Sequence, residues 1–300
     1  VSAGPIRTLA AKGKLGCMLV NTILILINVY HNKRSEHQLI GMGLGTVFSN
    51  IIGYLLISSL NIGLACEIAR AREKKKDRIV GIYYQRALVV DFIACILIIT
   101  PLLYISNKIL AWNELSDNKV IEAIGKYLFQ LVPSIYAFTF FDTTRVYLQS
   151  QYIRSPPMLI LLVSLFFHYF IADLLVARSD MESMGAAWAK NFTDICCAIA
   201  IYVYIVRSEV VKTTWIEWNM QCLTNWRRHL KLFIIIGFTS YLEALMFLLF
   251  IVLGSSLTHF DLAAHISLAN WTQIFLMIFL GLKQGLLTQL YELIAKNMWK

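Results

Sequence analysis

The sequence predicts an all-α membrane protein with about eight transmembrane helices. Two observations predict this class: 58% of the 300 residues are hydrophobic, and only 15% are charged. A soluble domain carries about 25% charged residues, which cover its water-facing surface. The apolar residues also lie in long blocks separated by short polar gaps. A helix needs about 20 mostly apolar residues to cross the hydrocarbon core of a bilayer.

Eight apolar blocks are read as spans, although the first is short. They are residues 15–30, 39–66, 87–107, 122–148, 157–177, 184–206, 231–254 and 261–283. The longest polar connection follows the sixth block. We therefore expect an N-terminal six-helix lobe over residues 1–206, a cytoplasmic linker over 207–230, and the first two helices of a second lobe over 231–300.

The basic residues indicate how the chain is oriented in the membrane. They concentrate in the N-terminal segment and in the gaps after the second and sixth blocks, whereas the opposite set of gaps holds Lys33, Arg34, Lys108, Lys119 and Arg178. Cytoplasmic loops carry an excess of lysine and arginine, so we expect a multi-pass protein with a cytoplasmic N-terminus. The net charge of +9 follows from this placement. The expected partner is the lipid bilayer of the plasma membrane or an organelle, not nucleic acid.

Enzyme and metal chemistry are not indicated. The six cysteines lie mostly inside apolar blocks without a Cys-x-x-Cys pair, so we expect neither a disulfide framework nor a metal site. A membrane-embedded transferase needs clustered carboxylates, a His–Asp pair or a phosphate-binding loop. The sequence contains no Asp-Asp-x-x-Asp or His-x-x-x-Asp cluster and no glycine-rich phosphate loop. We therefore expect no enzyme and no organic cofactor.

Three polar side chains inside the apolar blocks are candidates for binding an ion or a substrate. An ionisable group at the centre of a bilayer costs about 2.5–3.5 kcal/mol on insertion scales, so it needs a partner or a function. Glu243 lies about a dozen residues into the seventh block with no basic residue within one helical turn. His168 lies among phenylalanines in the fifth block, and Asn50 lies in the second. The alternatives are a protonated structural glutamate, a packing histidine and an asparagine bonded between helices.

Two further pairs are spaced to meet on one face of a helix. Asp142 and Arg145 are three residues apart near the cytoplasmic end of the fourth block, and Lys190 and Asp194 are four apart in the sixth. Side chains at these spacings are neighbours on a helix surface. We expect a structural ion pair at the helix end from Asp142 and Arg145. Asp91 is placed near the cytoplasmic start of the third block, where we expect a structural role.

Several motifs occur in a characteristic order. They are Gly-Ile-Tyr-Tyr-Gln-Arg-Ala at 81–87, Asp-Thr-Thr-Arg-Val-Tyr-Leu-Gln-Ser-Gln at 142–151 followed by Pro-Pro-Met at 156–158, Gly-Ala-Ala-Trp-Ala at 185–189, and Tyr-Leu-Glu at 241–243. This set resembles the MATE family, the multidrug and toxin extrusion transporters. The matching family patterns are G-x-x-x-Q-R-A, (E/D)-P-x-R-x-Y-L-Q-x-Q with P-x-M, G-A-A-x-A, and C-L-E.

The resemblance implies two six-helix lobes around a central cavity that opens alternately to either side. It implies a secondary antiporter that exports small organic, often cationic, compounds against entry of protons or sodium ions. Eight blocks cover one such lobe and two helices of a second, so we expect a fragment, or a chain that needs a missing C-terminal lobe or a second copy. The second glutamate of the seventh-helix motif falls on Leu248, and a glutamate of some members falls on Asn270. The alternatives are therefore a related lipid flippase, or a truncated or degenerate relative without transport.

Overall fold

The computed structural model describes residues 36–105, 118–179, 181–208 and 226–253, with isolated stretches between 212 and 224 and single residues between 261 and 290. The regular structure of this part of the chain is helical. Its elements are α2 (Glu36–Ser49), η1 (Asn50–Tyr54), α3 (Leu55–Glu73), α4 (Asp77–Ala94), η2 (Cys95–Ile99), α6 (Asn118–Ser150), α7 (Ser155–Ala172), η3 (Asp173–Arg178), α8 (Glu182–Arg207), η5 (Met220–Leu223) and α9 (Trp226–Leu253).

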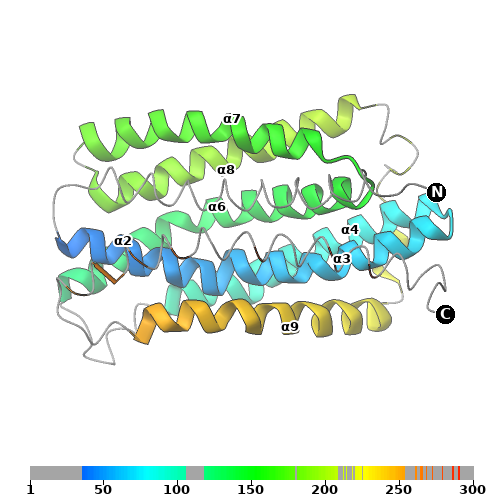
Figure 1. Cartoon of the computed structure of the whole chain (residues 1–300), viewed down its shortest axis with the longest axis horizontal. Coiled ribbons are helices and arrows are strands. Elements are labelled where there is room, and N and C mark those ends of the chain that lie inside the picture. Colours follow the sequence, from blue (N-terminus) through cyan, green and yellow to red (C-terminus); the bar gives the residue numbers. More distant parts are fainter. Residues whose placement is uncertain are drawn as a thin grey trace.

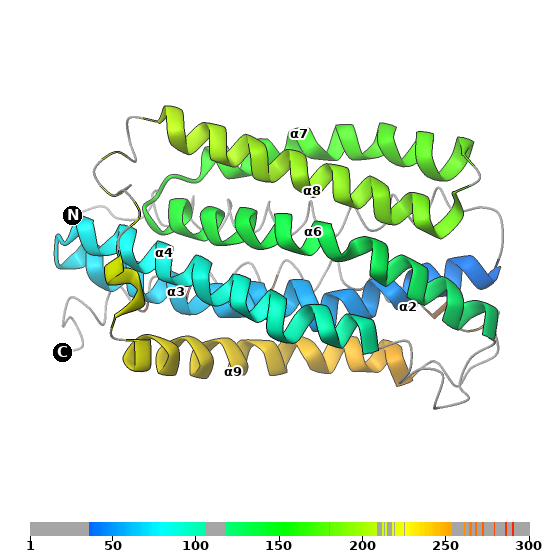
Figure 2. The ribbon, with the colours of Figure 1, turned by 180° about the vertical axis from the view of Figure 1, so that it is seen from behind.

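The long helices run side by side along the longest axis of the molecule (Figure 1). In both views α7 and α8 lie along one edge, α9 lies along the opposite edge, and the remaining helices lie between them (Figures 1 and 2). Helix α6 packs against α8, α2 and α3, and α9 packs mainly against α3. Helix α6 therefore contacts most of the other described helices.

Four helices in the described residues are long and apolar enough to cross a membrane. They are Ile40–Arg72, Asp77–Ile105, Ser155–Val176 and Met184–Arg207. Helices α6 and α9 run alongside them. The predicted span at 15–30 lies outside the described residues, and only single residues of the span at 261–283 are described. The multi-pass helical class is confirmed; the number of eight spans, the lobe boundaries and the cytoplasmic N-terminus stay predictions.

The helices are longer than the apolar blocks that predict them. Helix α4 begins at Asp77, ten residues before the expected span at 87, and α9 begins at Trp226 instead of 231. The cause is that polar residues at the helix ends are helical as well. Arg86, just before the expected start at 87, lies in the middle of α4 and is buried, because it finds hydrogen-bond acceptors on another segment. Hydropathy therefore locates the apolar centre of a helix better than its ends.

The polar and apolar side chains are distributed as in a protein whose surroundings are lipid. Large apolar side chains face outward, including Leu97 and Phe166, each 69% exposed. The described interior instead contains charged groups such as Asp91, Asp142 and Lys190. In water this arrangement would be unfavourable, because exposed apolar area and buried charge both cost free energy. In a bilayer the outward apolar surface contacts hydrocarbon, and interior charges can pair, as Asp142 does with Arg145 and Lys190 with Asp194.

Candidate functional site

The first polar cluster lies where α6 contains a proline. A proline inside a helix lacks the N–H donor, and its ring clashes with the carbonyl four residues earlier. Helix α6 runs through Pro133 without ending, and Figure 2 shows it bent part-way along its length. The Asn191 side chain of α8 hydrogen-bonds to the two backbone groups that would form the next i→i−4 pair of the helix. Its Oδ1 accepts from Ser134 N at 3.0 Å, and its Nδ2 donates to Gln130 O at 2.7 Å. In an uninterrupted helix these two backbone groups would pair with each other.

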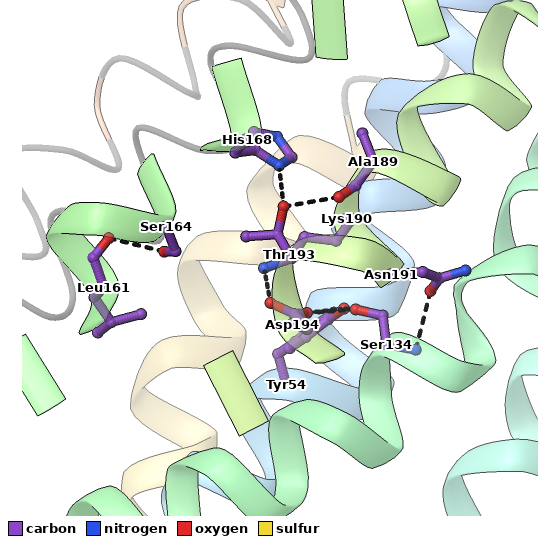
Figure 3. Close-up of polar contacts among 10 residues, drawn as sticks. All are labelled: Tyr54, Ser134, Leu161, Ser164, His168, Ala189, Lys190, Asn191, Thr193 and Asp194. Atoms are coloured by element: carbon purple, nitrogen blue, oxygen red, sulfur yellow. Dashed lines mark hydrogen bonds and ion pairs between the residues drawn. The ribbon is translucent and has the colours of Figure 1, made fainter. Parts of the chain in front are cut away.

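Asp194 is the centre of this cluster (Figure 3). Lys190 Nζ donates to Asp194 Oδ1 at 2.9 Å, and Ser134 Oγ donates to Asp194 Oδ2. Tyr54 Oη lies 2.6 Å from Ser134 Oγ and 3.5 Å from Asp194 Oδ2. The Lys190 ammonium is also 5.4 Å from the centre of the Tyr54 ring, a cation–π distance. The carboxylate is thus neutralised and hydrogen-bonded from η1, α6 and α8.

His168 of α7 reaches the same cluster through Thr193 (Figure 3). Its Nδ1 lies 2.8 Å from Thr193 Oγ1, and that hydroxyl donates its hydrogen to Ala189 O at 2.8 Å. A hydroxyl carries a single hydrogen, so the bond to His168 is one in which Nδ1–H donates. With its hydrogen on Nδ1, the imidazole satisfies both contacts of the Thr193 hydroxyl.

The second polar cluster is built by the motif at the end of α6. Arg145 Nε and Nη2 lie 3.0 and 2.5 Å from Asp142 Oδ1, and Nη1 donates to Gln149 Oε1 at 3.0 Å. Asn61 of α3 donates from Nδ2 to Asp142 Oδ2 at 2.8 Å. Both oxygens of the Asp142 carboxylate therefore have donors, and its charge is balanced by Arg145. These contacts fix α6 against α3.

The structure corrects the placement of Asp91. The sequence pattern put this residue near the start of its span, but α4 begins earlier, so Asp91 lies in the middle of the helix Asp77–Ile105. Its side chain is completely buried. Asp91 Oδ2 lies 2.8 Å from Thr143 Oγ1 of α6.

The described part of the linker is bound to the bundle by two motif residues. Arg86 of the Gln-Arg-Ala motif donates from Nε to Cys222 O at 2.9 Å and from Nη2 to Thr224 O at 2.8 Å and Gln221 O at 3.3 Å. Tyr147 of α6 lies 2.7 Å from Thr214 through their hydroxyl oxygens. The family motifs at 81–87 and 142–151 thus hold the segment that precedes α9.

Helix α9 approaches α3 at two glycines. A Cβ atom on Gly63 would lie 3.0 Å from Phe233 Cα, and one on Gly237 would lie 3.2 Å from Leu60 Cα. Small residues at such positions let helix backbones pack closely in membranes. Glu243 belongs to α9, but its side chain lies outside the described residues, so its surroundings stay a prediction.

Of the predicted site residues, the structure brings Asp142 and Arg145 into contact. His168 contacts Thr193, which is next to Asp194, and Asn50 lies half-buried at the start of η1, four residues before Tyr54. The sequence interpretation missed Tyr54, Ser134 and Asn191 as cluster members. A usable signal was Pro133 itself, since a proline inside a membrane helix needs polar partners for the freed backbone. Among the described residues no group of three or more His, Cys, Asp or Glu side chains could hold a metal ion.

Comparison with known proteins identifies relatives of the chain. The family model MatE matches residues 15–173. The chain is 28% identical over 217 residues to Protein DETOXIFICATION 49 of Arabidopsis thaliana, covering 72% of this chain and 43% of that protein. It is 25% identical over 229 residues to Multidrug and toxin extrusion protein 1 of Oryctolagus cuniculus, covering 75% of this chain and 39% of that protein. The chain spans less than half the length of these curated relatives.

Solved structures share the fold. The crystal structure of the eukaryotic MATE transporter AtDTX14 has a TM-score of 0.86 at 19% identity, covering 96% of this chain and 66% of that one. An outward-facing multidrug resistance MATE family transporter of the MOP superfamily has a TM-score of 0.75 at 18% identity, covering 93% and 62%. The family model matches more than half of the chain, which confirms the resemblance drawn from its motifs. The chain belongs to the MATE family, a family of membrane transporters and not of enzymes.

Proposed function

We propose that the natural protein is a secondary active antiporter that exports small organic, typically cationic, compounds in exchange for protons or sodium ions by alternating access. The observation that carries this proposal is the family match over residues 15–173 together with ionisable side chains buried at membrane depth. The named relatives support the substrate class, since they include a multidrug and toxin extrusion protein and detoxification proteins. Secondary transporters bind their ions near the bilayer midplane, at the interface of two structural repeats.

Glu243 is the first candidate for ion coupling. It belongs to α9, which packs on α3 through the glycine contacts described above. No basic residue lies within one helical turn of it in the sequence, and such a carboxyl group can bind and release a proton or a cation as its surroundings change between two states. Asn50 supplies a polar group on the continuous helix that leads into α3.

His168 is the second candidate. Its Nδ1 contacts Thr193, which precedes Asp194 in α8, so protonation of His168 would add a positive charge near the Lys190–Asp194 pair. That charge would compete with Lys190 for the Asp194 carboxylate. Proton uptake at His168 is therefore expected to rearrange contacts among α6, α7 and α8.

Transport is tested with the natural protein reconstituted in proteoliposomes. A pH gradient or a sodium gradient is imposed, and movement of a fluorescent organic cation such as ethidium is followed. In the Glu243→Gln variant the ion-driven transport rate is expected to fall at least tenfold, because the amide cannot exchange a proton. The variant should still insert into the membrane.

Glu122→Gln is the matched control. Glu122 makes an exposed pair with Lys126 at 2.7 Å near the start of α6, so its amide variant should transport at the normal rate. Normal ion-driven transport by Glu243→Gln would refute the assigned residue. An absence of transport by the unaltered protein with either gradient would refute the proposed function.

A further inference from the structure

The carboxyl group of Asp91 is the least compensated charge among the described residues of the second polar cluster. It is completely buried in α4 and contacts one side chain, Thr143. Its other oxygen, Oδ1, has no hydrogen-bond partner in the described part of the chain. The amide oxygen of Asn61, which is likewise completely buried, also has none there. Two acceptor oxygens in one buried cluster thus lack donors.

The hydrogens around Thr143 do not suffice for an ionised Asp91. Thr143 Oγ1 lies 2.8 Å from two acceptors, Asp91 Oδ2 and Thr139 O. The hydroxyl has one hydrogen, so only one of these contacts is a full hydrogen bond donated by Thr143. A backbone carbonyl cannot donate, which leaves Asp91 as the possible source of the second hydrogen. Asn61 Nδ2 donates its two hydrogens to Asp142 Oδ2 at 2.8 Å and to Thr143 Oγ1 at 3.4 Å, so it brings none to Asp91 Oδ2 or to Thr139 O.

None of the described charges that face Asp91 neutralises it. From α6, Asp142 is already paired with Arg145, so it brings no net positive charge to the cluster. From α3, the facing group is the neutral amide of Asn61. On the continuation of its own helix the nearest titratable group is the Cys95 thiol, which contacts Thr139. The remaining cation of α4 in this region, Arg86, is bound to carbonyls of η5, which packs against α4. Within the described part of the chain, an ionised Asp91 would therefore be a buried, unpaired charge, which proteins avoid.

We propose that Asp91 is a buried proton-binding site. The proton sits on Oδ2 and is donated to Thr143 Oγ1, which in turn donates its own hydrogen to Thr139 O. This arrangement satisfies both 2.8 Å contacts and removes the unpaired charge. The binding step adds one proton to a carboxylate and breaks no bond. The site joins α4 to α6 and is distinct from Glu243 of α9, so it does not depend on the transport proposal.

Release of this proton has a structural consequence. Loss of the proton would leave two carboxylates, Asp91 and Asp142, with Arg145 as the one cation that the described residues place in this cluster, and two acceptors competing for the hydrogen of Thr143. The packing of α4 on α6 and α3 is therefore tightest with the proton bound. Release is expected only when α4 moves enough for water to reach Asp91.

The test is infrared spectroscopy of the natural protein in lipid, with carbon-13 at the side-chain carboxyl of aspartate. The label leaves Glu243 silent, so failure of this test and failure of the transport proposal are distinguishable. At neutral pH the protein should show one protonated-aspartate carbonyl band. Asp91→Asn should abolish it, whereas the control Asp173→Asn should keep it, because Asp173 is paired with Arg178 at the exposed end of η3.

If the Asp91→Asn variant does not fold, the Thr143→Val variant provides a second infrared test of the same contact. It removes the acceptor of the proposed hydrogen bond, so the band should move to higher frequency without disappearing. Two results would overturn the proposal: the absence of a protonated-aspartate band at neutral pH, or a band unchanged by both substitutions at this contact. Aspartate carboxylate bands that respond to sodium but not to choline would also overturn it, because they would indicate a bound metal cation in place of the proton.

Discussion

Replacing Asn191 by leucine removes the amide that bridges the proline bend of α6. Ser134 N and Gln130 O would then lose the partners they now have at 3.0 and 2.7 Å. An unpaired buried polar group costs about 1–3 kcal/mol, whereas side-chain bonds between membrane helices average about 0.6 kcal/mol. With two groups affected, we expect a loss of about 2–4 kcal/mol in the free energy of unfolding.

The cost should depend on the proline. Pro133→Ala restores a backbone N–H and removes the ring clash, so the helix can pair Ser134 N with Gln130 O directly. A double-mutant cycle measures this dependence. In the Pro133→Ala background, Asn191→Leu should cost less than half as much as in the unaltered protein.

The assay is unfolding in mixed micelles with increasing dodecyl sulfate, followed by circular dichroism. Cys196→Ala is the matched control on the same helix, because Cys196 is exposed and its loss should change stability little. Equal costs of Asn191→Leu with and without Pro133 would refute the reasoning, since the amide would then stabilise something other than the bend.

Two other outcomes are expected from the packing of the linker and of α8. Arg86→Ala should destabilise the protein by about 1.5–3 kcal/mol, because three carbonyls lose a charged donor. Trypsin should then cut the variant faster at the exposed Lys212. A cleavage rate equal to that of the control variant Arg78→Ala, in which an exposed arginine is replaced, would contradict this reasoning. Gly185→Ala should cost about 1–3 kcal/mol, because the new Cβ would lie 2.3 Å from Leu175 O and the backbone must move. Gly53→Ala should be close to neutral in the same unfolding assay, since its Cβ would meet only the flexible end of a side chain at 3.0 Å; equal costs for the two glycines would count against the contact.

The class of the fold was predictable because hydropathy reports directly on the surroundings of each segment. The pairs Asp142–Arg145 and Lys190–Asp194 were also predictable, because their members are three and four residues apart on one helix. The family was recognisable from short motifs in a fixed order. Each of these inferences uses information that is local in the chain.

The contacts between helices were not predictable in this way. Asn191 and Ser134 are 57 residues apart, and the register of α6 against α8 is set by side-chain packing that a single sequence does not report. Asp91 was misplaced for a related reason. Hydropathy put the start of its span ten residues too late, because the charged first turns of α4 read as a loop.

The anchoring of the linker by Arg86 has a consequence for the biogenesis of the protein. Arg86 and its farthest acceptor, Thr224, are 138 residues apart. While the ribosome synthesises the intervening chain, the guanidinium lacks the three carbonyls that accept its hydrogen bonds in the folded protein. We therefore expect α4 to stay near the membrane interface, where water can hydrate Arg86, during insertion. Its final depth is reached only after residue 224 has been made, so folding of the earlier helices is completed by a segment synthesised after all of them.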